Sequence, residues 1–219
     1  HDHFLGFEMI SKKARDIPPF IVMDVLEEAQ KLARQGASVI HLEVVEPDFD
    51  TPEFIKEACF RAIREGKTHY THSLGIMELR EAIAEDYRDR YGVTVSPEQV
   101  LVASGTSPAL LLIFSALLEP GDEVILSNPC YACYPNIIRF VDGVPAFVEV
   151  MEEDGFQYLP ERIEARLNAR VKGIMVNSPS NPTGNVMSEE RMEKIAGLSP
   201  LIISDEIYHA LVYEGKGRS

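Results

Sequence analysis

Cysteine is scarce in this sequence, with three residues among 219. A small, odd number of thiols does not provide the disulfide framework of small secreted domains. Two of them, Cys130 and Cys133, have the C-x-x-C spacing of redox motifs, so a redox site is one hypothesis. The chain is 45% hydrophobic, which is enough to bury the core of one large domain, or of one domain plus a fragment of another.

Basic residues are also few: 21 Lys and Arg stand against 35 Asp and Glu, a net charge of -14. This balance argues against nucleic acid or an anionic membrane as a partner. No apolar run reaches the roughly 18 residues that span a bilayer, and the first residues lack a basic segment followed by an apolar one. Gly-x-Gly-x-x-Gly and Walker motifs are missing too. We therefore expect a cytoplasmic protein without a metal site.

The most informative stretch is 201–208, Leu-Ile-Ile-Ser-Asp-Glu-Ile-Tyr. Its branched apolar residues predict a buried strand of an α/β sheet, which places Asp205 at the carboxyl end, where such sheets carry their chemistry. A second buried strand is predicted at 172–176, and the loop 177–184 after it contains two prolines and a glycine. Such a loop is rigid and can hold Asn181 in a fixed pose, although an Asx-Pro turn alone is more often structural.

The remaining pattern alternates strands and helices. Strands are predicted at 39–45, 101–104, 123–127 and 145–150; helices are predicted at 19–36, at 51–66 with Thr51 as its cap, from 76 with Ile76, Leu79, Ile83 and Tyr87 inward, at 109–118 and at 160–167. This succession predicts an α/β fold in three layers, a mostly parallel sheet with helices on both faces.

The helix predicted at 109–118 is apolar nearly all round, which predicts burial between the sheet and another layer. Ser107 is the expected cap and Pro108 the first helical residue, so the N–H groups of Thr106 and Ser107 face outward at the positive end of the helix dipole. That end suits a phosphate. The alternative is that the cap is purely structural, because every such helix needs one.

Four motifs occur in order along the chain: Gly105-Thr106-Ser107, Pro129-Cys130-Tyr131, the Asn181 loop, and Ser-Asp-Glu-Ile-Tyr at 204–208. Together they resemble the class I/II aminotransferases of fold type I, which use pyridoxal 5′-phosphate (PLP), and the resemblance runs from about Pro19 to the end of the chain. It implies a PLP-dependent transferase-like major domain that is incomplete here. Residues 1–45 would be an N-terminal arm and part of a small domain, and 46–219 the PLP-binding large domain, truncated at its carboxyl side.

The resemblance also assigns roles. Asp205 would raise the pKa of the ring nitrogen, so that the ring accepts electrons from the substrate α-carbon. The other implied cofactor contacts are Asn181 and Tyr208 at the phenolate oxygen, Tyr131 stacked on the ring, and Gly105, Thr106 and Ser107 at the phosphate, joined by Tyr70 of the partner subunit in a homodimer. Tyr131 has two prolines and a second tyrosine close to it in the sequence. These neighbours suit a PLP site better than a redox site.

Two departures from the family pattern stand out. The lysine that forms a Schiff base with the cofactor lies farther along the family's chain; Lys216, 11 residues after Asp205, is too near to match, so no catalytic residue is assigned. Val45 replaces a glycine near the substrate carboxylate, and a β-branched residue does not take a positive φ cheaply.

The implied function is transfer of an amino group between an amino acid and a 2-oxo acid by an enzyme of which this chain is the N-terminal fragment. The alternatives are a non-catalytic half-protein that binds PLP, or a PLP-dependent β-lyase of the same fold.

Overall fold

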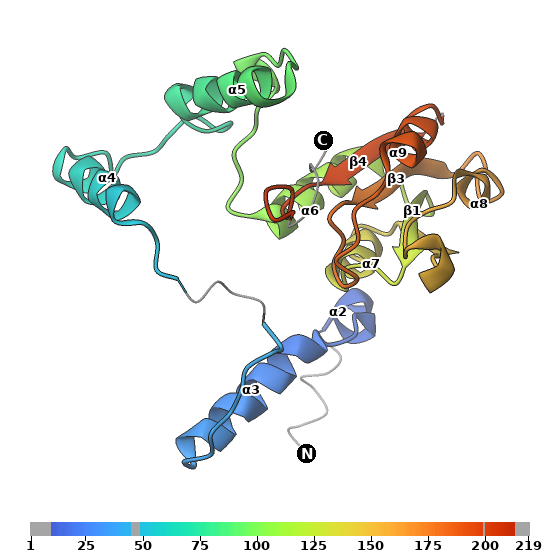
Figure 1. Ribbon diagram of the computed structural model, residues 1–219, viewed down its shortest axis with the longest axis horizontal. Coiled ribbons are helices and arrows are strands. Elements are labelled where there is room, and N and C mark those ends of the chain that lie inside the picture. The colour runs from blue at the N-terminus through green and yellow to red at the C-terminus, as the bar shows by residue number, and fades with distance from the viewer. Residues whose placement is uncertain (1–9, 45–48, 199, 213–219) are drawn as a thin grey trace. The chain divides into compact units, whose positions relative to one another are not determined.

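A computed structural model of the chain describes residues 10–44, 49–198 and 200–212 (Figure 1). The chain divides into two compact units. One unit combines His1–Pro18 with Ser104–Ser219, and the other is Pro19–Ala103. The first contains the sheet and the second is helical where it is described.

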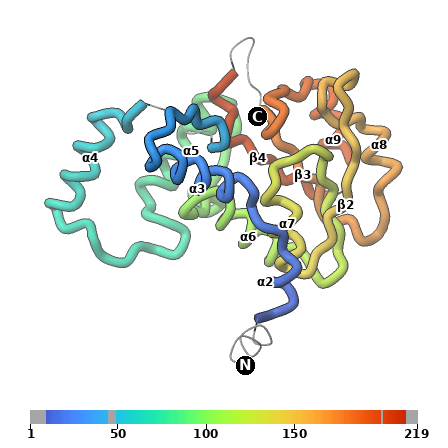
Figure 2. The backbone as a smooth tube through the Cα atoms, turned by 90° about the horizontal axis from the view of Figure 1, so that it is seen from below, coloured from blue at the N-terminus to red at the C-terminus, as the bar shows by residue number. Residues whose placement is uncertain are grey.

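The first unit is built on a four-stranded sheet in the order β2-β1-β3-β4. Figure 2 traces the backbone and labels β2, β3 and β4. Its strands are β1 (Glu123–Asn128), β2 (Val144–Glu149), β3 (Val171–Asn177) and β4 (Leu201–Asp205), and every neighbouring pair is parallel. The strands predicted at 123–127, 145–150, 172–176 and 201–205 are confirmed to within about one residue. Continuous apolar runs mark them because a parallel strand is buried on both faces.

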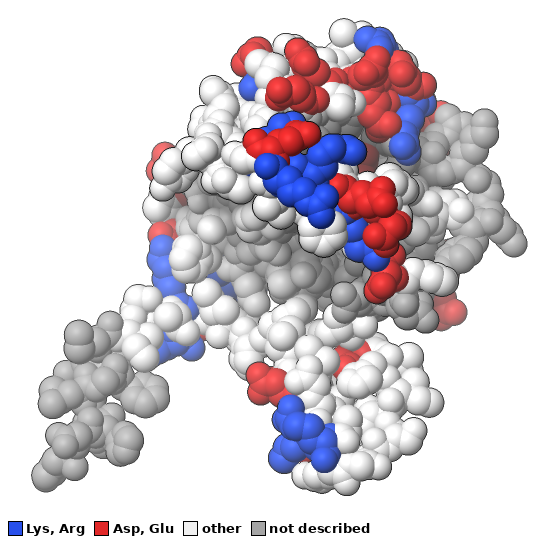
Figure 3. Space-filling view, turned by 90° about the vertical axis from the view of Figure 1, so that its left-hand side faces the viewer, with Lys and Arg blue, Asp and Glu red and all other residues white. Residues whose placement is uncertain are grey.

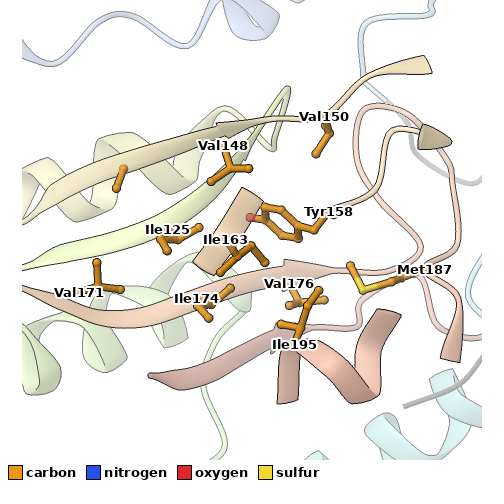
Figure 4. Packing of buried hydrophobic residues seen from close by; sticks show 11 residues of the cluster. Ile125, Val148, Val150, Tyr158, Ile163, Val171, Ile174, Val176, Met187 and Ile195 are labelled. Carbon is orange, nitrogen blue, oxygen red and sulfur yellow. The ribbon is translucent and has the colours of Figure 1, made fainter. Parts of the chain in front are cut away.

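Helices cover both faces of this sheet, as predicted. On one face, α6 (Thr106–Leu117) and α7 (Cys133–Phe140) pack against the sheet; their cluster consists of Leu110, Phe114, Leu118, Val124, Leu126, Tyr134, Ile138, Met175 and Ile203. On the other face, α8 (Pro160–Glu164) and α9 (Glu189–Ala196) bury a second cluster, in which Ile163 and Ile195 meet side chains of β1, β2 and β3 (Figure 4). The three-layer α/β architecture is therefore confirmed.

Successive residues of one strand serve opposite clusters. In β1, Val124 and Leu126 face α6 and α7, whereas Ile125 between them faces α8 and α9. This follows from the two-residue period of a strand. Ile125 is fully buried, so its side chain contributes about 2 to 5 kcal/mol by the cost of truncating such residues to alanine.

A short helix near the start of the chain belongs to the same unit. Helix α2 (Lys12–Asp16) begins after Ser11, whose hydroxyl accepts from the N–H of Ala14. Lys13 Nζ donates to the carbonyl of Phe140 at 3.0 Å and to Asp142 Oδ2 at 2.7 Å. These bonds fasten α2 to the end of α7.

The second unit contains α3 (Ile21–Arg34), α4 (Glu53–Arg64), α5 (Met77–Tyr91) and the 3₁₀ turn η1 (Pro97–Gln99). The predicted inward face of α5 is wrong for three of its four residues: Ile76, Leu79 and Tyr87 are exposed, whereas Ile83 is half-buried. Arg80 is the buried residue of this helix. The reason is that α5 packs on η1, where Arg80 Nε donates to the carbonyls of Pro97 at 2.9 Å and Val100 at 3.2 Å. A guanidinium satisfies those carbonyls and an apolar side chain does not.

Two predicted strands are not formed in the described residues. Residues 39–44 lie outside the sheet, with Ile40 and Leu42 largely exposed, and Val45 falls outside the described residues. Residues 101–104 are also irregular, and the N–H of Val102 donates instead to the carbonyl of Leu74 at 2.9 Å. A strand needs a hydrogen-bonding neighbour, which local sequence cannot supply.

Several helix ends also differ from prediction. Helix α4 has Pro52 rather than Thr51 at its N-cap, and α8 ends at Glu164 rather than at 167. Helix α6 begins at Thr106 with Gly105 as N-cap, so Ser107 lies inside the first turn. Gly105 has a φ of 138°, which only glycine adopts without strain, and this lets the helix start earlier. Helix α6 is also covered on one side only within the described residues, because Leu112 is 53% exposed.

Candidate functional site

A cavity of about 360 Å³ lies at the carboxyl ends of β1, β3 and β4. In the order β2-β1-β3-β4, the chain leaves β1 toward β2 and leaves β3 toward β4 on the other side. The gap between β1 and β3 is therefore a topological switch point, where open α/β sheets bind their ligands. The cavity is lined by Ser104, Gly105, Thr106, Ser107, Pro108, Tyr131, Tyr134, Asn177, Asn181, Asp205, Ile207 and Tyr208.

Seven of the eight sequence-predicted cofactor residues share this cavity: Gly105, Thr106, Ser107, Tyr131, Asn181, Asp205 and Tyr208. Tyr70 does not belong to it, because it lies in the second unit, on a fully exposed loop. Lys216 lies outside the described residues. The structure thus brings together motifs that are up to about a hundred residues apart in the chain.

The start of α6 forms one wall. Its N-cap is Gly105, and no side chain among the described residues caps it. The first N–H groups of a helix have no partner within the helix and carry partial positive charge, so Thr106 and Ser107 offer donors to an anion. Among the groups that line the cavity, the start of α6 is the one best suited to bind a phosphate.

Asp205 ends β4 and is only 8% exposed. Its Oδ2 accepts a hydrogen bond of 2.6 Å from the hydroxyl of Tyr134, and its Oδ1 accepts one of 3.2 Å from the N–H of Ile207. Burial, together with the hydrogen bond to the Asp205 carboxylate, raises the pKa of Tyr134 well above its usual value near 10. Tyr134 therefore stays protonated and donates to the carboxylate at every physiological pH.

Tyr131 follows the end of β1 and stands edge-on to Tyr134, with ring centroids 5.3 Å apart and an interplanar angle of 79°. Its hydrogen bond with Cys133, followed by burial, raises the pKa of Tyr131 to about 12. The neighbouring Cys130 is half-buried, and burial raises the pKa of its thiol to about 11. A thiol that stays protonated is a poor nucleophile, which argues against Cys130 as the attacking thiol of a redox site.

Asn181 and Tyr208 come from two different loops and meet at the cavity. Asn181 Nδ2 donates to the hydroxyl of Tyr208 at 3.4 Å. The N–H of Asn181 donates to Asn177 Oδ1 at 2.7 Å, and Asn177 Nδ2 donates to the carbonyl of Asp205 at 2.9 Å. The two loops are therefore connected by side-chain hydrogen bonds on the cavity wall.

Sequence reasoning assigned no site role to Tyr134 or Asn177. Tyr134 lies in α7, a helix that the sequence analysis did not predict and that contains Pro135 in its first turn. Asn177 is the residue of β3 that pairs with Asp205 of β4, so both end their strands at the same level, and this register is a property of the sheet that local sequence does not give. The described residues contain no group of three or more His, Cys, Asp or Glu side chains that could hold a metal ion.

Comparison with known proteins agrees with this geometry. The model of the family described as aminotransferase class I and II matches residues 37–218. The chain belongs to this family. Members of the family depend on PLP, so PLP is the cofactor to consider for this cavity.

Individual relatives are similar over almost the whole chain. The (5-formylfuran-3-yl)methyl phosphate transaminase of Methanocaldococcus jannaschii is 45% identical over 95% of this chain and 54% of its own length. The aspartate/prephenate aminotransferase of Thermus thermophilus is 44% identical over 94% of this chain and 55% of its own length.

The solved structure of Thermus thermophilus aspartate aminotransferase with maleate superimposes with a TM-score of 0.93 at 43% identity. It covers 96% of this chain and 56% of that one. The chain therefore spans about half the length of the relatives it matches.

Proposed function

We propose that this chain is the amino-terminal part of a PLP-dependent aminotransferase, which transfers an amino group between an amino acid and a 2-oxo acid. The observation that carries the proposal is the cavity itself. A buried carboxylate, the start of a helix, tyrosine rings and a pair of hydrogen-bond donors face a single space of about 360 Å³. Bound PLP supplies an electron sink for the substrate α-carbon, which depends on a protonated ring nitrogen.

Asp205 is the residue we assign to that ring nitrogen. A nearby carboxylate favours the protonated form of a heterocyclic nitrogen, and Asp205 is well suited because it is buried and held at both oxygens. Tyr134 keeps the carboxylate in one orientation. We name Tyr134 a positioning residue for this reason, since it acts through Asp205.

The other walls are assigned by their chemistry. Gly105, Thr106 and Ser107 would hold the phosphate at the start of α6, and Tyr131 would offer its aromatic face to the ring. Asn181 and Tyr208, which hydrogen-bond each other, would hold the phenolate oxygen. Tyr70 of the partner subunit would join the phosphate, and this part of the proposal rests on the resemblance alone.

We also propose a homodimer in the cytoplasm. Large apolar side chains are exposed on both units, including Leu112 of α6 and Phe54 and Phe60 of α4, and such surface is normally covered. The domain assignment belongs to the same proposal: the PLP-binding part of the large domain lies within 46–219, and 1–45 supply an N-terminal arm and part of a small domain.

The charge of the chain argues against nucleic acid or an anionic membrane as a partner. The chain carries a net charge of -14, and in the upper part of Figure 3 Lys and Arg side chains lie beside Asp and Glu. Ion pairs occur along α5, where Arg90 Nε lies 2.6 Å from Asp86 Oδ1. No helix in the described segments is both long and apolar enough to cross a membrane.

The test uses the complete protein that carries this chain. The PLP-loaded protein is mixed with a panel of L-amino acids, and conversion to the pyridoxamine form is followed by absorbance. Asp205→Asn should weaken PLP binding by about ten- to a hundredfold, the equivalent of one hydrogen bond to a charged group, whereas Asp89→Asn on the exposed face of α5 should not. Release of ammonia without the pyridoxamine form would favour the β-lyase, and binding without turnover would favour a non-catalytic protein.

The 219-residue chain itself should bind PLP without a covalent bond, because the lysine that forms the Schiff base is not expected within it. Treatment with sodium borohydride should therefore fix PLP to the complete protein and not to this chain. Fixation to this chain would refute the absence of a reactive lysine.

A further inference from the structure

Asn177 links the two loops that carry Asp205 and Asn181. It is the last residue of β3, and its register partner, the last residue of β4, is Asp205. The backbone ladder between the strands stops at this pair, and Pro179, two residues on, has no N–H with which to extend it. From here the two chains separate into different walls of the cavity.

The side chain of Asn177 spans this separation. Its Nδ2 donates to the carbonyl of Asp205 at 2.9 Å, and its Oδ1 accepts from the N–H of Asn181 at 2.7 Å. Both partners are backbone groups with one possible role each, since a carbonyl only accepts and an N–H only donates. The orientation of the carboxamide is therefore fixed, and both of its ends are used.

A second bond closes the connection into a ring. Tyr208 lies three residues after Asp205, and its hydroxyl accepts from Asn181 Nδ2 at 3.4 Å. The Asp205 loop and the Asn181 loop are thus joined at two points. Asn177 forms the shorter of these connections, in a half-buried position on the cavity wall.

We propose that Asn177 is a positioning residue that sets the spacing between Asp205 and Asn181, and so matches the cavity to a ring that both residues contact from different sides. The inference rests on the proposed function, because it takes Asp205 as the partner of the ring nitrogen and Asn181 as a partner of the phenolate oxygen. Its consequence is that Asp205 and Asn181 bind as a coupled pair.

Two variants separate the ends of the carboxamide. Asn177→Asp keeps an acceptor for the N–H of Asn181 but turns a carboxylate oxygen toward the Asp205 carbonyl, which repels it. Asn177→Ala removes both bonds. The added negative charge of Asn177→Asp repels the phosphate of every phosphate-bearing ligand alike, so it lowers their affinities together. It attracts a protonated ring nitrogen, so a lost preference for that nitrogen cannot come from charge.

The probes are three ligands that bind reversibly because they lack the aldehyde. They are pyridoxine 5′-phosphate, its analogue with carbon in place of the ring nitrogen, and its analogue without the 3-hydroxyl group. Affinities are measured by calorimetry with the complete protein in its cofactor-free form. The preference for the parent compound over the first analogue reports on Asp205, and the preference over the second reports on Asn181 and Tyr208.

We expect Asn177→Asp to lose about tenfold in affinity for the parent compound, and to lose its preference over the ring-nitrogen analogue only. Asn177→Ala should lose both preferences. The matched control is Asn128→Asp at the end of the neighbouring β1: Asn128 Nδ2 donates to the carboxylate of Glu149 at 2.9 and 3.1 Å and does not line the cavity. Asn128→Asp should be less stable but keep both preferences.

The outcomes distinguish the two proposals. If the unaltered protein shows neither preference, the assignment of Asp205 and Asn181 to the ring fails. If it shows both and Asn177→Ala retains them, the positioning role of Asn177 is refuted. Circular dichroism checks folding, and Asn177→Ser, whose short hydroxyl cannot reach both partners, replaces Asn177→Ala should that variant not fold.

Discussion

Replacing Tyr134 by phenylalanine tests the hydrogen bond that holds Asp205. The side chain is 2% exposed and its hydroxyl lies 2.6 Å from Asp205 Oδ2. The variant removes one oxygen atom and leaves a buried carboxylate oxygen without its donor. A hydrogen bond to a charged group contributes about 1.5 to 3 kcal/mol, so the free energy of unfolding at neutral pH should fall by this amount.

Tyr158→Phe is the matched control. Tyr158 is 3% exposed and donates at 3.0 Å to the carbonyl of Met175, so the same atom is removed from an equally buried ring with a neutral acceptor. The expected loss is about 0.5 to 1.5 kcal/mol. Urea unfolding of both variants and of the unaltered protein measures the difference directly.

The raised pKa of Tyr134 also predicts how the free energy of unfolding changes with pH. The folded-state pKa of Tyr134 is raised above its unfolded value near 10, so the stability it contributes is fully present below pH 10 and is lost as pH rises toward the folded pKa. The slope reaches about 1.4 kcal/mol per pH unit, because the unfolded chain releases a proton that the folded chain retains. Tyr134→Phe has no such proton, so its deficit should shrink above pH 10. A deficit equal to that of Tyr158→Phe at neutral pH, and constant up to pH 11, would refute this account.

Three further predictions concern other parts of the chain. Ile125→Ala should lower the free energy of unfolding by about 2 to 5 kcal/mol, and a loss under 1 kcal/mol in urea would contradict its place in the core. Cys130, whose pKa is raised to about 11 by burial, should react with iodoacetamide at pH 8 more slowly than the exposed Cys59; equal rates by peptide mass would contradict the burial. Arg80→Met should lower the free energy of unfolding by about 2 kcal/mol or more, because two carbonyls lose their donor. Arg88→Met breaks only exposed ion pairing with its neighbours and should lower it by under about 1 kcal/mol. Similar losses for the two variants would refute this difference.

The strands and the strand-end residues of the site could be predicted because they depend on local sequence. Residues 123–128 and 171–177 are apolar runs, and a parallel strand buried on both faces needs such a run. Once the run is located, the polar residue after it must lie at the sheet's carboxyl edge. Asp205 and the Asn181 loop were found in this way before any contact was known.

Other features depend on what packs against a segment. Residues 39–44 and 101–104 have strand-like composition, yet no neighbour in the described residues pairs with them. Helix α5 has an apolar stripe, but the partner it meets is the pair of carbonyls at Pro97 and Val100, which selects Arg80 for burial. A periodic pattern indicates a face and cannot say which neighbour will cover it.

The start of α7 shows why the sequence pattern did not predict the helix that carries Tyr134. Pro135 is its third helical residue, and proline is tolerated in a first turn because the N–H groups there have no partner within the helix. A proline in that position therefore permits a helix, although it looks like a break in the sequence. The helix then carries the Tyr134 hydroxyl to Asp205, 71 residues later in the chain.

Asn177 required a different kind of information. Sequence locates the end of each strand, but the neighbours of an end follow from the order β2-β1-β3-β4, which is a property of the whole sheet. The carboxamide at the end of β3 meets the carbonyl at the end of β4 because these two strands are neighbours in that order. Charged and aromatic groups that contact a ligand can be found one motif at a time, whereas a residue that sets the distance between two motifs becomes visible only when both lie in their places.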